Sequence, residues 1–356
     1  MSEINWHGKP YYSLDAYLKN TYNYKCYKVA LNAHMTCPNR DGTLGSQGCI
    51  FCSAGGSGDF AVSIDGSAGK NFPVSTAHFD IARQLEQGVA LIENKLGSSV
   101  TAIANYTENR AMVVSDSTES TLPVPNIIAY FQAYTNTYAP VGYLREIFTA
   151  ALSQKEVCGI SIATRPDCLP KEVLDLLAEL KAQFPAKFIW VELGLQTIHE
   201  ETAKYIRRGY ALPCFEEAMK KLQALDIPVI VHMILGLPGE TPEMMLETVR
   251  YLNAWKPFGV KLQLLHVLEH TDLAVDFANG KFDALTKDAY LDILIRCLEN
   301  LSPDIVIHRV TGDGPKKILI APKWSGNKRD VLNSLHRMMA VRKSQQGNVS
   351  DNSTPE

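Results

Sequence analysis

Short apolar runs alternate with longer amphipathic segments along most of the chain. Runs of about four to eight β-branched and apolar residues between turn residues predict strands. Segments whose apolar residues recur every three or four positions predict helices. The six predicted strands span residues 27–31, 127–134, 159–163, 188–194, 228–235 and 260–266.

Predicted helices lie between these strands, each placed to act as a crossover connection. The strands at 188–194 and 228–235 are almost continuously apolar, which is typical of strands covered on both faces. The pattern predicts the α/β class with a parallel sheet, and in such folds ligands bind at the carboxyl ends of the strands. The helices are expected at 76–95, 141–154, 171–183, 200–225 with a break at Pro213, and 241–255.

Two segments depart from the alternation. Residues 97–124 are rich in Ser, Thr and Asn and predict a surface insertion. From residue 281 onward, the pattern predicts a small α/β appendage made of a helix (288–301), a strand (305–310) and a last helix (330–341). The predicted organisation is an N-terminal extension (1–20), a main unit (21–275), a C-terminal extension (276–343) and a disordered tail (344–356).

Composition adds limits on the protein class. The chain has 356 residues, 46% hydrophobic and 21% charged, which is enough to bury a large core. The net charge of −3 excludes binding of polyanions over the whole surface and leaves a local basic patch open. The N-terminal residues lack a secretory signal, and no apolar run has the roughly 18 residues of a membrane span. We therefore predict a cytoplasmic location and no membrane partner.

Cysteine is distributed unevenly. Three of the eight cysteines lie within residues 37–52, and the others are scattered singly, which does not resemble a secreted disulfide framework. The scattered ones are interpreted as buried or inert thiols. The clustered ones are Cys37, Cys49 and Cys52, and the scattered ones are Cys26, Cys158, Cys168, Cys214 and Cys297.

Several kinds of site use clustered cysteines. A structural zinc site needs four protein ligands, most often with a second Cys-x2-Cys pair, and the sequence contains no such pair. A redox motif of the thioredoxin type uses two cysteines and leaves Cys37 unexplained. Three cysteines in a glycine-containing loop after a strand fit an iron-sulfur cluster with one open iron better.

The segment CPNRDGTLGSQGCIFC, from Cys37 to Cys52, resembles the cluster loop of the radical S-adenosylmethionine (SAM) superfamily, whose motif ends in Cys-x-aromatic-Cys. Eleven residues between the first two cysteines, instead of the common three, resemble the bacterial YhcC-type family and the related radical core of Elongator-subunit-3-like enzymes. The resemblance covers roughly residues 20–320. It implies a partial (βα)6 TIM-like barrel and a [4Fe-4S] cluster bound by Cys37, Cys49 and Cys52.

Further matches follow successive predicted strands, and the resemblance implies that they contact SAM. Ala133-Tyr134-Thr135 stands where relatives carry Gly-Gly-Glu or Gly-Gly-Thr, TRPD follows the third strand, and GLPG follows the fifth. Each match also has an ordinary structural explanation, such as a salt bridge or a helix cap. The SAM-binding residues expected from the resemblance are Phe51, Thr135, Asn136, Arg165, Glu192, Gln196, Arg208 and Gly236. His232, on an apolar strand, is interpreted as a hydrogen-bonded core histidine.

The activity implied by the resemblance is reductive cleavage of SAM to methionine and a 5'-deoxyadenosyl radical. It implies an external one-electron reductant of the flavodoxin or ferredoxin type. The chemistry belongs to the cofactors, and the protein supplies binding and orientation. A different class stays open: a non-catalytic iron-sulfur or zinc protein for binding or electron transfer, favoured by the Ala133-Tyr134 departure.

The substrate is not determined by these patterns. Residues 311–343 carry eight basic side chains and Trp324, which would suit an RNA backbone. Kinship with Elongator-like enzymes points in the same direction, toward tRNA. The alternative is a solvated helix with a basic face. The basic residues are Lys316, Lys317, Lys323, Lys328, Arg329, Arg337, Arg342 and Lys343.

Overall fold

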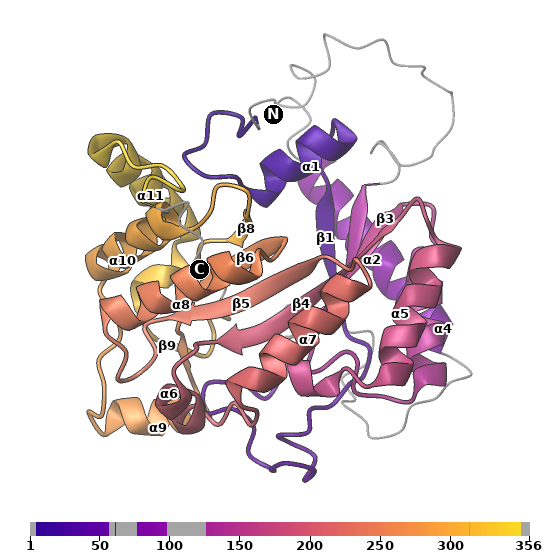
Figure 1. The fold of residues 1–356 in the computed structure, drawn as a ribbon, viewed down its shortest axis with the longest axis horizontal. Coiled ribbons are helices and arrows are strands. Elements are labelled where there is room, and N and C mark those ends of the chain that lie inside the picture. The colour runs from indigo at the N-terminus through magenta and orange to yellow at the C-terminus, as the bar shows by residue number, and fades with distance from the viewer. Residues whose placement is uncertain (1–4, 57–60, 62–76, 98–125, 313, 350–356) are drawn as a thin grey trace.

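The computed structural model describes residues 5–56, 61, 77–97, 126–312 and 314–349 (Figure 1). Its centre is a seven-stranded sheet in the order β1-β2-β3-β4-β5-β6-β8, and every neighbouring pair is parallel. The sheet curls into a half-barrel, which confirms the predicted α/β barrel class. The strands are β1 (Tyr27–Leu31), β2 (Ile127–Phe131), β3 (Val157–Thr164), β4 (Phe188–Gln196), β5 (Val229–Leu235), β6 (Gly259–Leu264) and β8 (Val306–Arg309).

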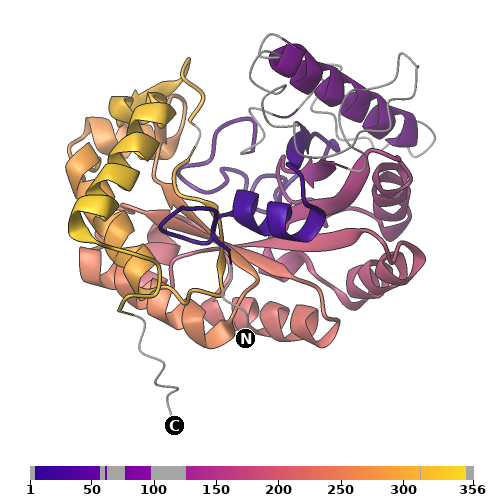
Figure 2. The ribbon, with the colours of Figure 1, turned by 90° about the horizontal axis from the view of Figure 1, so that it is seen from above.

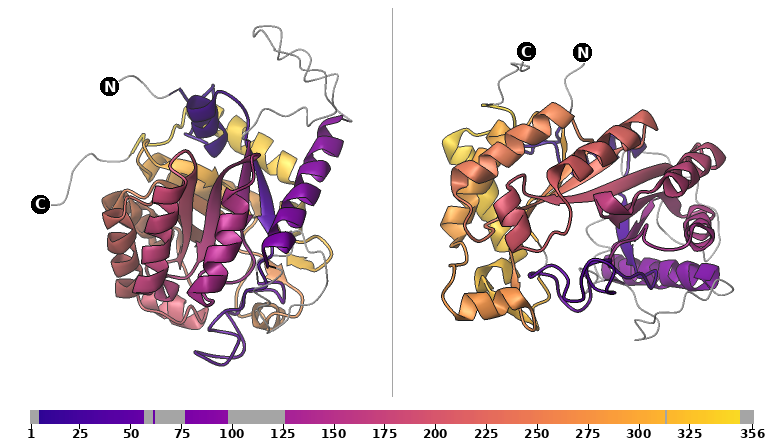
Figure 3. Two further views of the ribbon diagram at one scale, coloured as in Figure 1. Left: turned by 90° about the vertical axis from the view of Figure 1, so that its right-hand side faces the viewer. Right: turned by 60° about the horizontal axis from the view of Figure 1, so that its bottom comes forward.

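Helices cover the outer face of this sheet (Figure 3). Their apolar sides and the outward residues of the strands form one large core, as expected for a parallel sheet. The outer helices are α2 (Ala77–Gly97), α4 (Val141–Leu152), α5 (Lys171–Gln183), α6 (Glu200–Tyr205), α7 (Leu212–Ala224), α8 (Pro242–Trp255) and α10 (Lys287–Asn300).

The predicted helix at 200–225 is two helices, and the break lies before Pro213 instead of at it. Arg207 and Gly209 both have positive φ, +56° and +83°, which ends the right-handed helix. Pro213 falls in the first turn of α7, where a missing N–H costs nothing.

An N-terminal helix, α1 (Leu14–Tyr22), was not among the predicted elements. Ser13 caps it by accepting from the Ala16 N–H. Tyr17 on this helix packs edge-on against Trp190 of β4 and against Phe258. Helix α1 crosses the curled sheet in Figure 2, and its apolar side packs on the inner face at the amino ends of the strands.

The C-terminal region is more closely joined to the sheet than the sequence predicts. The strand expected in the appendage at 305–310 is β8, the seventh strand of the main sheet, paired with β6. A separate two-stranded antiparallel ribbon pairs β7 (Val267–Leu268) with β9 (Leu319–Ala321). The other elements of the region are α9 (Asp272–Ala278), the short 3-10 turn η3 (Lys323–Gly326) and α11 (Lys328–Arg342).

The tail predicted to be disordered is packed over residues 344–349. Gln346 is buried: its Oε1 accepts from the Tyr12 N–H at 2.9 Å, and its Nε2 donates to the carbonyls of Ser302 and Ile305. Satisfied hydrogen bonds of a polar side chain hold this segment where the lack of apolar residues predicted disorder. Residues 98–124 of the predicted insertion and residues 350–356 lie outside the described residues, where no helix is long and apolar enough to cross a membrane among those described.

Candidate functional site

The clustered cysteines lie in the loop that follows β1, at the carboxyl edge of the sheet. Asn39 and Arg40 brace this loop. Asn39 Nδ2 donates to the Arg207 carbonyl at 2.8 Å, and Arg40 Nη2 donates to the carbonyls of Cys52 at 2.8 Å and Ser53 at 2.6 Å. A Cβ at Gly48 would lie 2.9 Å from Arg40 Nε, so glycine makes room for the bracing arginine.

All three cysteines line one cavity of about 170 Å³. Each is partly buried, and none is in a disulfide. Burial, with the neighbouring Cys52, raises the pKa of Cys49 to about 12. A bound metal reverses that preference, because ligand thiols bind as thiolates.

Within the described residues, no group of three His, Cys, Asp or Glu side chains could hold a single metal ion. Cysteine ligands of a [4Fe-4S] cluster bind separate irons, so they surround the cluster. Three thiols spaced around one cavity, beside a loop braced by its own side chains, fit such a cluster.

Six of the eight expected SAM-binding residues line the same cavity as the thiols, and two do not. Gly236 has φ +87°, and a Cβ there would meet Leu285 at 2.8 Å, away from the thiols. Asn136 is buried and donates through Nδ2 to the Ala163 carbonyl at 3.0 Å, while its Oδ1 accepts no hydrogen bond. The lining residues are Phe51, Thr135, Arg165, Glu192, Gln196 and Arg208.

The two cavity-lining arginines are engaged with protein partners. Arg165 forms two hydrogen bonds to Asp167, Nε to Oδ1 at 2.9 Å and Nη2 to Oδ2 at 2.7 Å. Burial opposes its charge, but the Asp167 hydrogen bonds raise the pKa of Arg165. The Arg208 guanidinium donates to Glu200 and to the carbonyls of Leu195, Thr197 and Tyr210. Arg208 therefore organises the chain after β4.

Glu192 lies on the inner face of the half-barrel at the centre of a charged network. Its Oε1 accepts from Lys28 Nζ at 3.0 Å and from Ser161 Oγ at 2.6 Å. Its Oε2 accepts from His232 Nε2 at 2.7 Å and from Lys261 Nζ. Burial disfavours the carboxylate, but Lys261, Lys28 and the His232 hydrogen bond hold the pKa of Glu192 well below its usual range.

The partners of Glu192 were not predicted as site residues. His232 is hydrogen-bonded, as expected, but it also lines the cavity, with Gln263 Nε2 donating to its Nδ1 at 3.3 Å. Burial lowers the pKa of His232 to about 4, so the ring is neutral at pH 7. Lys261 had a usable signal: a lysine inside the otherwise apolar strand β6 is rarely buried without a partner.

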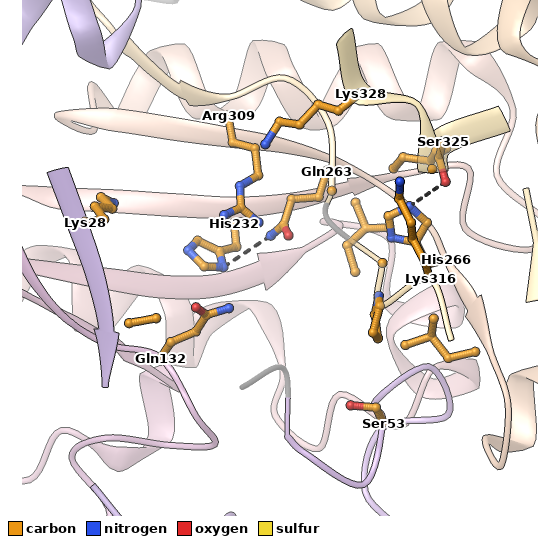
Figure 4. Close-up of a pocket in the computed structure, with 18 of the residues that line it drawn as sticks. Lys28, Ser53, Gln132, His232, Gln263, His266, Arg309, Lys316, Ser325 and Lys328 are labelled. Carbon is orange, nitrogen blue, oxygen red and sulfur yellow. Dashed lines mark hydrogen bonds between the residues drawn. The ribbon is translucent and has the colours of Figure 1, made fainter. Parts of the chain in front are cut away.

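A second, larger cavity of about 960 Å³ adjoins the thiol cavity and shares Phe51, Gln196, His232, Gln263 and Arg309 with it. Figure 4 shows side chains from opposite walls converging on this space. One wall comes from β1, β5 and β6, and the other from β8 and the segment that leads into α11. The site therefore has a thiol side made by one loop and an open side made by segments far apart in the chain.

Comparisons with known proteins match this arrangement. Residues 122–252 match the description "Radical SAM superfamily", and residues 257–340 match "Radical_SAM C-terminal domain". The chain is 39% identical to YtqA of Bacillus subtilis (strain 168), over 95% of the chain and 92% of that protein. It is 31% identical to YhcC of Escherichia coli (strain K12), over 90% of each.

More distant similarity extends to Elongator complex protein 3. The human protein is 24% identical over 85% of this chain and 55% of its own length. The solved structure of the archaeal Methanocaldococcus infernus Elp3 superposes with a TM-score of 0.59 at 15% identity, covering 91% of this chain and 65% of that one. At this identity the superposition shows a shared fold.

Proposed function

The chain belongs to the radical SAM superfamily, in the family that includes YtqA and YhcC, and on this basis we propose that it is an enzyme that reductively cleaves S-adenosylmethionine. The [4Fe-4S] cluster would be held by Cys37, Cys49 and Cys52. When bound, the cluster and SAM supply one-electron cleavage of the sulfonium and a carbon radical that abstracts hydrogen from a substrate.

One observation carries this proposal: the three thiols share a cavity with residues that follow β2, β3 and β4 at the carboxyl edge of the sheet. Thr135 and Arg165 come from the first two of these strand ends, and Gln196 ends the third. Convergence of successive strand ends on one ligand space is typical of enzymes built from βα units. The arrangement supports a cofactor bound beside the thiols.

The protein's own groups prepare this space. Phe51, next to Cys52, packs against an apolar cluster that includes Ile50 and Leu265, so one wall excludes water. Asp167 fixes the Arg165 guanidinium at the rim, and a fixed fork of this kind suits a carboxylate. Helix α1 packs at the opposite end of the sheet.

The sequence departure at Tyr134 does not remove the turn that glycine would allow. Tyr134 adopts φ +62°, a left-handed conformation that costs a non-glycine residue about 1 kcal/mol. Its hydroxyl donates to the Ala54 carbonyl at 2.5 Å, and its ring covers Gly56, where a Cβ would lie 2.3 Å from it. The preserved turn favours the enzyme over a non-catalytic iron-sulfur protein.

The proposal includes an external one-electron reductant of the flavodoxin or ferredoxin type. RNA stays a predicted substrate class, but the basic segment meant to bind it is divided. Trp324 packs against Tyr290 and donates through Nε1 to the Leu285 carbonyl at 3.0 Å, so its ring is held against the core. Lys316 and Lys328 line the large cavity.

The test is anaerobic reconstitution with iron and sulfide, followed by addition of SAM and dithionite. We expect about four irons per chain and formation of 5'-deoxyadenosine. A cluster that forms but yields no 5'-deoxyadenosine with dithionite or with reduced flavodoxin would overturn the enzyme proposal. One zinc per chain, without iron-sulfur absorption, would overturn the cluster as well.

A further inference from the structure

We propose that the 960 Å³ cavity binds an oxyanion of the substrate, a carboxylate or a phosphate, with Arg309 as its main partner. This inference rests on the proposed function, because it takes the cavity that adjoins the thiols as the place where the substrate enters. It adds a substrate class and the residues that would recognise it.

Positive charge dominates the lining of the cavity. Four cationic side chains line it, and among the described lining residues there is no Asp or Glu. They come from three separate parts of the fold: β1, the end of β8, and the segment before and at the start of α11. The four are Lys28, Arg309, Lys316 and Lys328.

The nearby Glu192 carboxylate does not balance this charge. It already accepts from Lys28, Ser161, His232 and Lys261, so its negative charge is used within the network. If Lys28 is assigned to Glu192, three cations are left. Asp313 lies outside the described residues, and one carboxylate there would still leave an excess of positive charge.

Arg309 is placed to meet a ligand near the thiol side. Figure 4 shows its side chain reaching from β8 toward His232 and Gln263, with Lys328 extending toward it from the start of α11. Arg309 lines both cavities, and its charge acts on His232 and on Lys261. A planar guanidinium with several donors suits the paired oxygens of a carboxylate or phosphate.

Neutral polar groups complete the lining. Gln132 and Gln263 point into the space in Figure 4, and Ser325 Oγ and His266 Nε2 are hydrogen-bonded to each other at 3.1 Å on the far side. Amides can donate to oxyanion oxygens without adding charge. A neutral or cationic substrate would leave the excess positive charge of this wall uncompensated.

The test measures anion binding instead of turnover. Cluster-loaded protein is titrated anaerobically by calorimetry with inorganic phosphate and, separately, with succinate, at constant ionic strength. We expect binding of at least one of the two, and the stronger one identifies whether phosphate or carboxylate is recognised. Arg309→Gln should weaken it by about tenfold or more, because a charge-assisted fork is lost.

Matched variants separate the cavity from general surface charge. Lys328→Gln should weaken binding less than Arg309→Gln does. Lys317→Gln should leave binding unchanged, because Lys317 is exposed beside Lys316 and does not line the cavity. Arg309→Lys keeps the charge and should recover part of the affinity, and circular dichroism of each variant shows that it is folded.

Two results would overturn the inference: no binding of either anion by the unaltered protein, or equal affinity in Arg309→Gln and Lys317→Gln. Neither depends on SAM cleavage. Anion binding that requires Arg309 in a protein that forms no 5'-deoxyadenosine would overturn the proposed enzyme function instead. The two failures are therefore distinguishable.

Discussion

The amino and carboxyl ends of the same sheet differ in chemistry. At the amino ends, Trp190 stacks on Phe188 with ring centroids 3.8 Å apart, and Tyr17 and Phe258 pack around it. At the carboxyl ends, thiols, amides and cations surround two adjoining cavities. The comparison assigns stability mainly to the aromatic end and ligand binding to the polar end, as in other barrels of βα units.

The largest effect on stability is expected at the aromatic end. Trp190 is 1% exposed, so Trp190→Ala should lower the free energy of unfolding by about 3–5 kcal/mol. Denaturant unfolding measures this loss, and Trp190→Phe should recover most of it. Iron bound per folded molecule should stay at the level of the unaltered protein. Loss of iron from folded Trp190→Ala protein would break the division between the two ends.

The next effect concerns the charged network between the ends. Glu192→Gln leaves Lys261 buried without its carboxylate, and we expect a loss of about 3 kcal/mol in unfolding free energy. The double variant Glu192→Gln with Lys261→Met should be more stable than the single variant, because it removes the unpaired lysine. If the double variant is the less stable of the two, the network does not depend on that charge pair.

The sequence predicted the thiol side better than the cavity walls for a physical reason. Cys37, Cys49 and Cys52 lie within one loop, so their spacing alone indicates a shared ligand. Lys28, His232, Lys261 and Arg309 come from four different strands and meet only through the curl of the sheet. No local pattern connects them.

The fold shows the same limit. Helix α5 matches the predicted span of 171–183, because its apolar periodicity is local. The strand at 305–310 was expected in an appendage, because a short apolar run does not indicate which sheet it joins. Arg208 was predicted beside the cofactor from its motif, yet its donors are directed to backbone carbonyls and Glu200.

A smaller effect should appear as a pH dependence of stability. Burial lowers the pKa of His232 to about 4, below the roughly 6.5 of an unfolded histidine. Between these values the unfolded chain binds more protons, so stability should fall as pH decreases from about 6.5 to 4, by up to about 3 kcal/mol. Urea unfolding across this range measures the slope.

His232→Gln should flatten that slope, whereas His270→Gln, at an exposed position, should not. Glu192 adds stability that is present above its unfolded pKa and is lost only as pH falls toward its lower folded value, so it acts below this window. An unchanged slope in His232→Gln would contradict the burial of a neutral imidazole at the cavity wall.

The most direct test of the central claim is electron paramagnetic resonance of the reduced, cluster-loaded protein with and without SAM. We predict a cluster signal that changes when SAM is added, in the unaltered protein and in Cys214→Ala, whose thiol lies outside the thiol cavity. Alanine at Cys37, Cys49 or Cys52 should abolish the change. A signal that is insensitive to SAM, or that responds equally in all of these variants, would contradict the account.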